Sequence, residues 1–133
     1  MERYTQRQFL NALTRAALAA EAIGSLNESE TLLRQALGHA KRAFGSNHPQ
    51  YAAMLIHLAE TCAGQSNFSE AERCYDEAII VLTDNYGASH PSVAIGYRNL
   101  SEILKEQGRL SEAADAAFRA RIIFADSNCL AGN

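Results

Sequence analysis

Apolar residues recur at intervals of three and four positions along successive segments of the chain, and polar residues or glycines separate these segments. Such spacing places the apolar side chains on one face of an α-helix. The pattern predicts helices over about residues 5–23 and 28–44, a third from Pro49 to a stop at Gly64, and a fourth from Ser69 to a stop at Gly87. The same arrangement follows once more, 42 residues further on. We therefore expect an all-helical protein.

The same spacing predicts which side chains face inward and where the helices begin and end. Inward positions are expected at Phe9, Leu13, Ala16, Ala17 and Ala20; at Leu33, Ala36, Leu37, Ala40 and Phe44; at Tyr51, Leu55, Leu58, Ala59 and Cys62; at Ala71, Tyr75, Ala78, Ile79, Leu82 and Tyr86; and at Val93, Tyr97, Leu100, Ser101 and Leu104. Asn27 and Ser69 are expected to cap the second and fourth helices, because their side chains can accept hydrogen bonds from free backbone N–H groups. Gly45 and Gly87 are expected to end those helices.

A block of 42 residues is repeated along the chain. The segment Gly45-Ser46-Asn47-His48-Pro49 returns as Gly87-Ala88-Ser89-His90-Pro91. Ala36, Ala78 and Ala120 recur in the same register, where small side chains let two helices approach closely. A fixed period of this length indicates an array of stacked repeats. We expect a single domain, 1–133, with repeats at about 8–46, 50–88 and 92–125 and a tail at 126–133.

Several positions carry a family resemblance. Leu58-Ala59, Phe68, Ala71, Tyr75 and Ala78, followed by Gly87 and His90-Pro91, resemble the tetratricopeptide repeat, and the 42-residue spacing resembles the longer repeat of kinesin light chains. The resemblance covers roughly residues 8–125. It implies an all-α, right-handed superhelical solenoid of three antiparallel helix hairpins. It also implies a protein-protein interaction module that binds a partner protein or peptide in a concave groove, as adaptor or scaffold. The partner itself does not follow, because the repeat serves unrelated proteins.

In such a groove the first helix of each hairpin is implied to supply the binding residues. The candidates are Asn11, Arg15, His57, Glu60, Arg98, Asn99, Glu102 and Lys105, and the same stripes carry Leu18, Ile56 and Ile95. Asn99 matches the family's Asn that resembles a side chain pairing with the backbone of a bound peptide; His57 and Arg15 replace it in the earlier repeats. The charges are mixed, so no preference for an acidic or a basic ligand follows. Each candidate can also be read as part of a solvated helix face.

The last helix carries three successive apolar residues, Ile122, Ile123 and Phe124, near its expected end. In one interpretation they pack back on the last hairpin or lie under the tail, since isolated apolar residues are common on surfaces. In the other they stack on a second copy and make a homo-oligomer, which would be a self-associating scaffold. The sequence leaves both open.

Charge and composition narrow the partners and the setting. The net charge is −3 and no basic run is present, so nucleic acid and anionic membranes are not expected partners. No run approaches the roughly 20 apolar residues that span a bilayer, and the first residues lack the apolar core of a secretion signal. Three cysteines without metal-ligand spacing fit a reducing compartment. We expect a cytoplasmic protein.

The sequence offers little for catalysis. The four histidines form no recognised ligand spacing with carboxylates or thiols, and two of them, His48 and His90, belong to the repeat junctions. No phosphate loop or nucleophile elbow is present. We expect no metal, no cofactor and no enzymatic activity. A third hypothesis keeps a redox or enzymatic role for Cys129, expected to be exposed, or for Cys62, expected with Cys74 to be buried.

Overall fold

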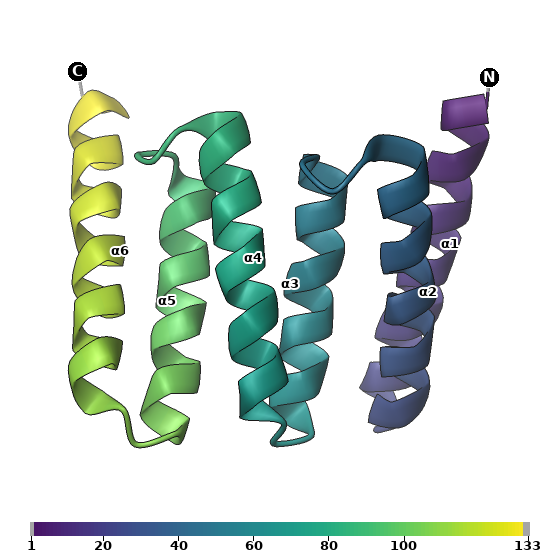
Figure 1. Cartoon of the computed structure of the whole chain (residues 1–133), viewed down its shortest axis with the longest axis horizontal. Helices are drawn as coiled ribbons and strands as arrows, with labels where there is room; N and C mark the ends of the chain where they lie inside the picture. Colours follow the sequence, from purple (N-terminus) through teal and green to yellow (C-terminus); the bar gives the residue numbers. More distant parts are fainter. Residues whose placement is uncertain (1, 132–133) are drawn as a thin grey trace.

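The computed structural model describes the backbone of residues 2–131 and the side chains of residues 5–127. Within that part the chain forms six α-helices and no strand: α1 (Glu2–Ala22), α2 (Leu26–Phe44), α3 (Pro49–Gly64), α4 (Phe68–Tyr86), α5 (Pro91–Glu106) and α6 (Leu110–Ala131). The helices stand side by side in chain order and alternate in direction, with the first hairpin at one end of the row and α6 at the other (Figure 1). Each helix packs mainly on its neighbours in the chain. The fold is the expected all-α helical repeat solenoid.

One core runs through all three hairpins. Ala36, Ala78 and Ala120 are buried at equivalent positions, as the register predicted. Most predicted inward positions of the third, fourth and fifth helices are buried as well. Glu70 and Glu72 of α4 reach the neighbouring hairpins, where they pair with Arg34 (3.6 Å) and Arg109 (2.6 Å). These ion pairs are exposed, so apolar packing contributes most of the stability of the array.

The repeat junctions are closed by histidine. His48 and His90 occupy the N-cap positions of α3 and α5, where the ring Nδ1 atoms accept hydrogen bonds from the N–H groups of Gln50 (3.0 Å) and Ser92 (3.1 Å). The following proline lies in the first helical turn, where its missing N–H is not needed. Phe44 and Tyr86 stack on the two rings at centroid distances of 4.7 and 4.6 Å. Tyr86 was expected to face inward, but it covers His90 and is 47% exposed.

Two predicted helix caps are wrong. The helices α2 and α4 begin earlier, and Ser25 and Asn67 hold their N-cap positions without a side-chain hydrogen bond. The turn before α4 is closed by backbone bonds, with Asn67 N–H donating to the Cys62 carbonyl at 2.8 Å, so the helix restarts before Ser69. Asn27 lies inside α2 and accepts a hydrogen bond from Gln65 Nε2 at 2.7 Å, which links the first two hairpins.

The two ends of the array also depart from the prediction. Phe9 and Ala16 of α1 were expected to face inward, but both are exposed, Phe9 by 46%, because no described helix covers that side of α1. Leu10, which was not predicted to face inward, is buried. At the other end α6 runs to Ala131, through residues that were expected to form a tail. Ile123 is buried and Phe124 is partly buried against the core, while Ile122 is 46% exposed. Two of the three apolar residues thus pack back on the last hairpin, as in the first of the two interpretations, and Ile122 is left exposed.

No helix in the described part of the chain is long and apolar enough to cross a membrane.

Candidate protein-binding face

The first helices of the three hairpins, α1, α3 and α5, present equivalent positions at intervals of 42 residues. We call their solvent-facing side chains the first-helix face; it consists of Asn11, Arg15, Leu18, Glu21, Ile56, His57, Glu60, Ile95, Arg98, Asn99, Glu102 and Lys105. Every candidate binding residue predicted from the sequence lies on it. Of these candidates, His57 and Asn99 are half-buried and the others are exposed.

Three side chains at one register position of this face lack partners. Within the part of the chain whose side chains are described, Arg15 and Asn99 make no hydrogen bond or ion pair, and the buried Nδ1 of His57 has no hydrogen-bond partner. Of these groups only His57 Nδ1 is shielded from water, and a polar atom shielded without a partner costs free energy. Arg15 is exposed and Asn99 is half-buried, so both are open to a ligand. This row combines a guanidinium, an imidazole and an amide, which together can donate to and accept from a peptide backbone.

Glu60 and Glu21 add negative charge beside His57. Although Glu60 is exposed as a residue, its carboxyl is partly shielded by its neighbours, and this partial burial raises its pKa above the ordinary value. The charge of His57 lowers the pKa of Glu60, and that of Glu21 raises it. Sequence reasoning missed Glu21. The repeat register could have identified Glu21, because it lies 84 residues, or two repeats, before the predicted candidate Lys105. Ala63 holds the equivalent position in the repeat between them.

Two of the predicted basic residues are already engaged. The Arg98 guanidinium lies 5.8 Å from the centroid of the Phe124 ring, and Lys105 Nζ is 3.3 Å from Glu102 Oε1. Apolar contact area is supplied instead by Leu18 and Ile95, both exposed, and by the half-buried Ile56. The face therefore offers mixed polar and apolar contacts without one dominant charge.

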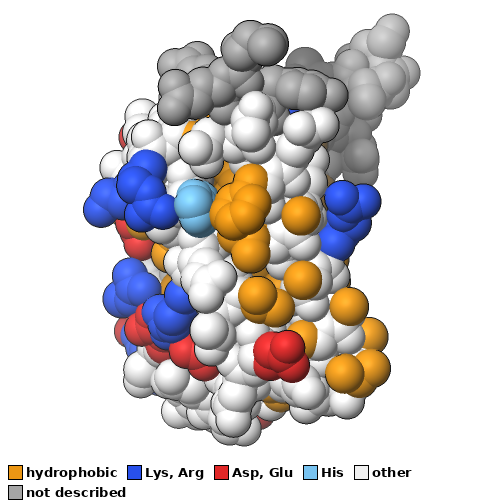
Figure 2. Space-filling view, turned by 90° about the vertical axis from the view of Figure 1, so that its right-hand side faces the viewer, with side chains coloured by type: hydrophobic (Ala, Val, Ile, Leu, Met, Phe, Trp, Pro, Cys, Tyr) orange, Lys and Arg blue, Asp and Glu red, His pale blue; other side chains and the backbone are white. Residues whose placement is uncertain are grey.

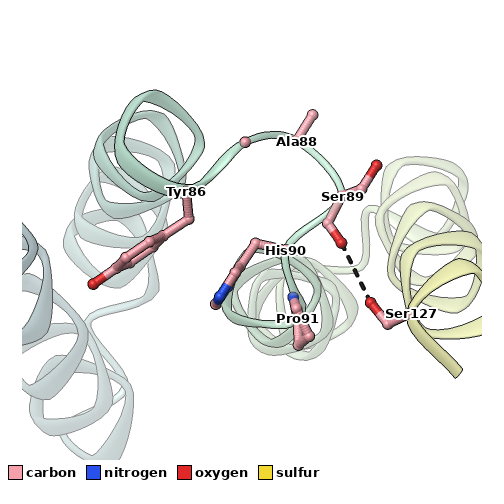
Figure 3. Close-up of a pocket in the computed structure, with 7 residues that line it drawn as sticks. Tyr86, Ala88, Ser89, His90, Pro91 and Ser127 are labelled. Atoms are coloured by element: carbon pink, nitrogen blue, oxygen red, sulfur yellow. Dashed lines mark hydrogen bonds between the residues drawn. The ribbon is translucent and has the colours of Figure 1, made fainter. Parts of the chain in front are cut away.

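A shallow hollow lies at the junction of α4 and α5, away from these residues (Figure 3). Tyr86 and His90 form one side of it, and Ser127 Oγ donates a hydrogen bond to the Ser89 carbonyl at 3.3 Å on the other. Its polar groups are those that close the repeat junction. We therefore assign it to the architecture of the array.

The cysteines described do not support nucleophilic chemistry. Cys62 and Cys74 are buried and unpaired, and burial raises the pKa of both thiols, that of Cys74 to about 12. Both remain protonated near neutral pH, and the thiol form is a poor nucleophile. The Cys129 side chain lies outside the described residues. Among residues whose side chains are described, no group of three or more histidine, cysteine or carboxylate side chains could hold a metal ion.

These features define a class of protein: a helical repeat array with a polar and apolar face on its first helices. The family model for the tetratricopeptide repeat matches residues 8–79 and again residues 52–121. The chain belongs to the tetratricopeptide repeat family, whose members generally mediate protein-protein interactions and are not catalytic. No curated protein sequence matches the chain.

Solved structures show the same fold. One is BtubC (BKLC) from P. vanneervenii, with a TM-score of 0.84 at 18% identity, over 90% of this chain and 48% of that one. Another is a putative kinesin light chain from Podosopora anserina with nearly identical TPR-like repeats, with a TM-score of 0.79 at 20% identity, over 89% of this chain and 56% of that one. The chain spans about half the length of these proteins, and its fold is that of kinesin-light-chain-like repeat proteins.

Proposed function

We propose that this chain is an adaptor without catalytic activity that binds a segment of a partner protein, extended or helical, along the first-helix face. The observation that carries the proposal is the row of unpaired polar side chains, Arg15, His57 and Asn99, at one register position of three successive repeats. A peptide lying across the repeats meets one of these groups on each, and its own backbone groups then keep hydrogen-bond partners as water leaves.

The chemistry of the face also limits the partner. Glu60 and Glu102 oppose a strongly acidic segment, and Arg15 opposes a strongly basic one, so electrostatics selects against highly charged ligands. Leu18, Ile56 and Ile95 favour a segment that carries apolar side chains between polar ones. The net charge of −3 leads us to propose neither nucleic acid nor an anionic membrane as partner. We also propose a cytoplasmic setting, with which the free thiols of Cys62 and Cys74 are consistent.

The proposal is tested by selection from a displayed library of random peptides. The wild-type protein, an Arg15→Ala/Asn99→Ala double variant and a matched Arg42→Ala/Gln35→Ala variant are immobilised in parallel. The control changes the same kinds of side chain at exposed positions of α2, outside the first-helix face. We expect related peptides to be enriched on the wild type and the control but not on the Arg15/Asn99 variant. Equal enrichment on all three proteins would refute the assignment of the face.

A second candidate function is a scaffold that self-associates through its terminal repeats. It is favoured by exposed apolar side chains at both ends of the array, Ile122 and Phe118 on α6 and Phe9 and Ile23 on the side of the first hairpin.

A further inference from the structure

The first helix presents an apolar seam to solvent at the end of the array. Phe9, Ala12, Ala16 and Ala19 of α1 are exposed, Phe9 by 46%, and so is Ile23 directly after the helix, by 79%. We call these five residues the α1 outer face. Their alternating spacing of three and four residues is that of a coiled-coil seam. Figure 2 views the molecule from the end formed by the first hairpin, and apolar side chains run down this end.

The same face of the later first helices is an interface. The residues 42 positions on from Phe9, Ala12, Ala16 and Ala19 are buried, and so are those 84 positions on. In α3 they are Tyr51, Met54, Leu58 and Thr61, and in α5 they are Val93, Gly96, Leu100 and Ile103. These side chains lie between each hairpin and the one before it. From Phe9 to Ala19 the α1 outer face is therefore a third copy of a face that the chain buries twice, and no described residue covers it.

The far end of the array is a poor occupant for this face. The contact of α4 with α5 is made by Ile79, which lies so close to Gly96 that a Cβ there would be 2.8 Å from Ile79 Cγ1. The equivalent position in α2 is Leu37, which is also apolar. In α6 that position is Arg121, an exposed side chain whose guanidinium lies 5.7 Å from the centroid of the Phe118 ring. Head-to-tail stacking would bury this charge against Ala12, at a cost that apolar contacts do not offset.

A second copy of α1 fits better. The seam has nearly the same spacing in both directions from Ala16, with Phe9 seven residues before it and Ile23 seven residues after it. In an antiparallel pair Phe9 of each copy meets Ile23 of the other, and the alanines between them allow the helices to approach closely. Beside Phe9 a small hollow lined by Thr5, Gln6, Phe9 and His39 can receive the Ile23 side chain of the second copy.

We propose that two copies of this protein associate through their α1 outer faces, antiparallel, about a two-fold axis that passes near Ala16. The contact is isologous and closes at two copies, which is the commonest symmetry of soluble oligomers. It develops the self-association alternative given above. Because the α1 outer face and the first-helix face use different side chains, failure of the dimer leaves partner binding standing, and the reverse also holds.

Solution mass tests the interface. Light scattering or sedimentation of the full chain over a hundredfold concentration range is expected to show a reversible dimer that survives reducing agent. Ala16→Glu places two carboxylates near the axis and should weaken the dimer at least about tenfold. The matched Ala114→Glu variant, at an exposed alanine of α6, should leave the dimer unchanged. A wild-type monomer throughout, a dimer unaffected by Ala16→Glu, or equal weakening by both variants would overturn the proposal.

Crosslinking tests the orientation. In a Cys129→Ser background, where the remaining native cysteines are buried, Ala16→Cys should form a disulfide between copies when an oxidant is added. Phe9→Cys should not, because two antiparallel helices hold these positions about 21 Å apart along the axis. Efficient crosslinking through position 9 would indicate parallel helices and overturn the proposed symmetry.

Discussion

His48 and His90 show how a single residue type defines the boundary between repeats. The ring of each accepts a backbone hydrogen bond at a helix N-terminus and stacks on an aromatic side chain from the preceding helix. One imidazole thus fixes both the start of a helix and its position against the previous hairpin. Serine or aspartate at the same position would supply the cap without the stacked ring.

This double role gives a prediction. His48→Ala and His90→Ala should each lower the free energy of unfolding by about 1 kcal/mol, the usual cost of losing an N-cap side chain. Urea denaturation measures the change. The control is His90→Asn, which keeps a capping side chain and should recover much of the loss. An asparagine variant as unstable as the alanine variant would show that the cap contributes little.

The pKa of Glu60 gives a second prediction at this scale. Burial raises it, so the folded protein holds this proton more tightly than the unfolded chain does. The unfolded chain therefore loses this proton at a lower pH than the folded protein does. As a result, stability falls as pH rises from the ordinary pKa of glutamate through the raised pKa of Glu60. Glu60→Gln should have the same thermal midpoint as the wild type near pH 4 and a higher one near pH 7. A variant that is less stable at neutral pH would contradict this sign.

Some residue-level features could be predicted from the sequence, and others could not. Proline in the first turn and glycine at helix ends follow from backbone chemistry, so Pro49 and Gly45 were placed correctly. The caps at Asn27 and Ser69 were misplaced because tight turns closed by backbone hydrogen bonds let each helix begin earlier. Composition alone does not show that a backbone bond makes a side-chain cap unnecessary.

At the scale of elements, the contact between α4 and α5 depends on a glycine. A Cβ at Gly96 would lie 2.8 Å from Ile79 Cγ1, closer than packed side chains tolerate. Gly96→Ala should therefore destabilise the protein by about 1 kcal/mol, because overpacking of about 1–3 kcal/mol exceeds the gain in helix propensity.

A matched glycine separates the two effects. A Cβ at Gly38 of α2 would make an ordinary contact of 3.5 Å with Arg42 Nη1. Gly38→Ala should therefore stabilise the protein by up to about 1 kcal/mol through helix propensity alone. Chemical denaturation of both variants gives the comparison. Equal stabilisation by the two substitutions would show that the α4–α5 contact adapts without cost.

The six helices could be predicted because apolar periodicity and the 42-residue repeat agree along most of the chain. The errors lie at its two ends. Phe9 and Ala16 follow the apolar pattern of α1 yet are exposed, because no described helix covers that side of α1. At the other end α6 continues to Ala131. The residues after Phe124 carry no apolar stripe, so the sequence pattern did not predict that they are helical.

At the scale of the whole molecule, repetition explains why the candidate site was largely predictable. Residues 42 positions apart occupy equivalent places, so one recognised position, Asn99, also identified His57 and Arg15. The state of each side chain was not predictable. Arg98 lies over Phe124, and His57 has a buried nitrogen without a partner, and both facts depend on neighbours that are distant in sequence.

Binding of a protein segment to the first-helix face can be tested directly. The most direct measurement is a titration of the ¹⁵N-labelled protein, followed by two-dimensional NMR, with a peptide from the selection described above. We expect amide shifts to concentrate on α1, α3 and α5 around Arg15, His57 and Asn99 and to vanish in the Arg15→Ala/Asn99→Ala variant. Shifts concentrated on α2, α4 and α6, or unchanged in that variant, would contradict it.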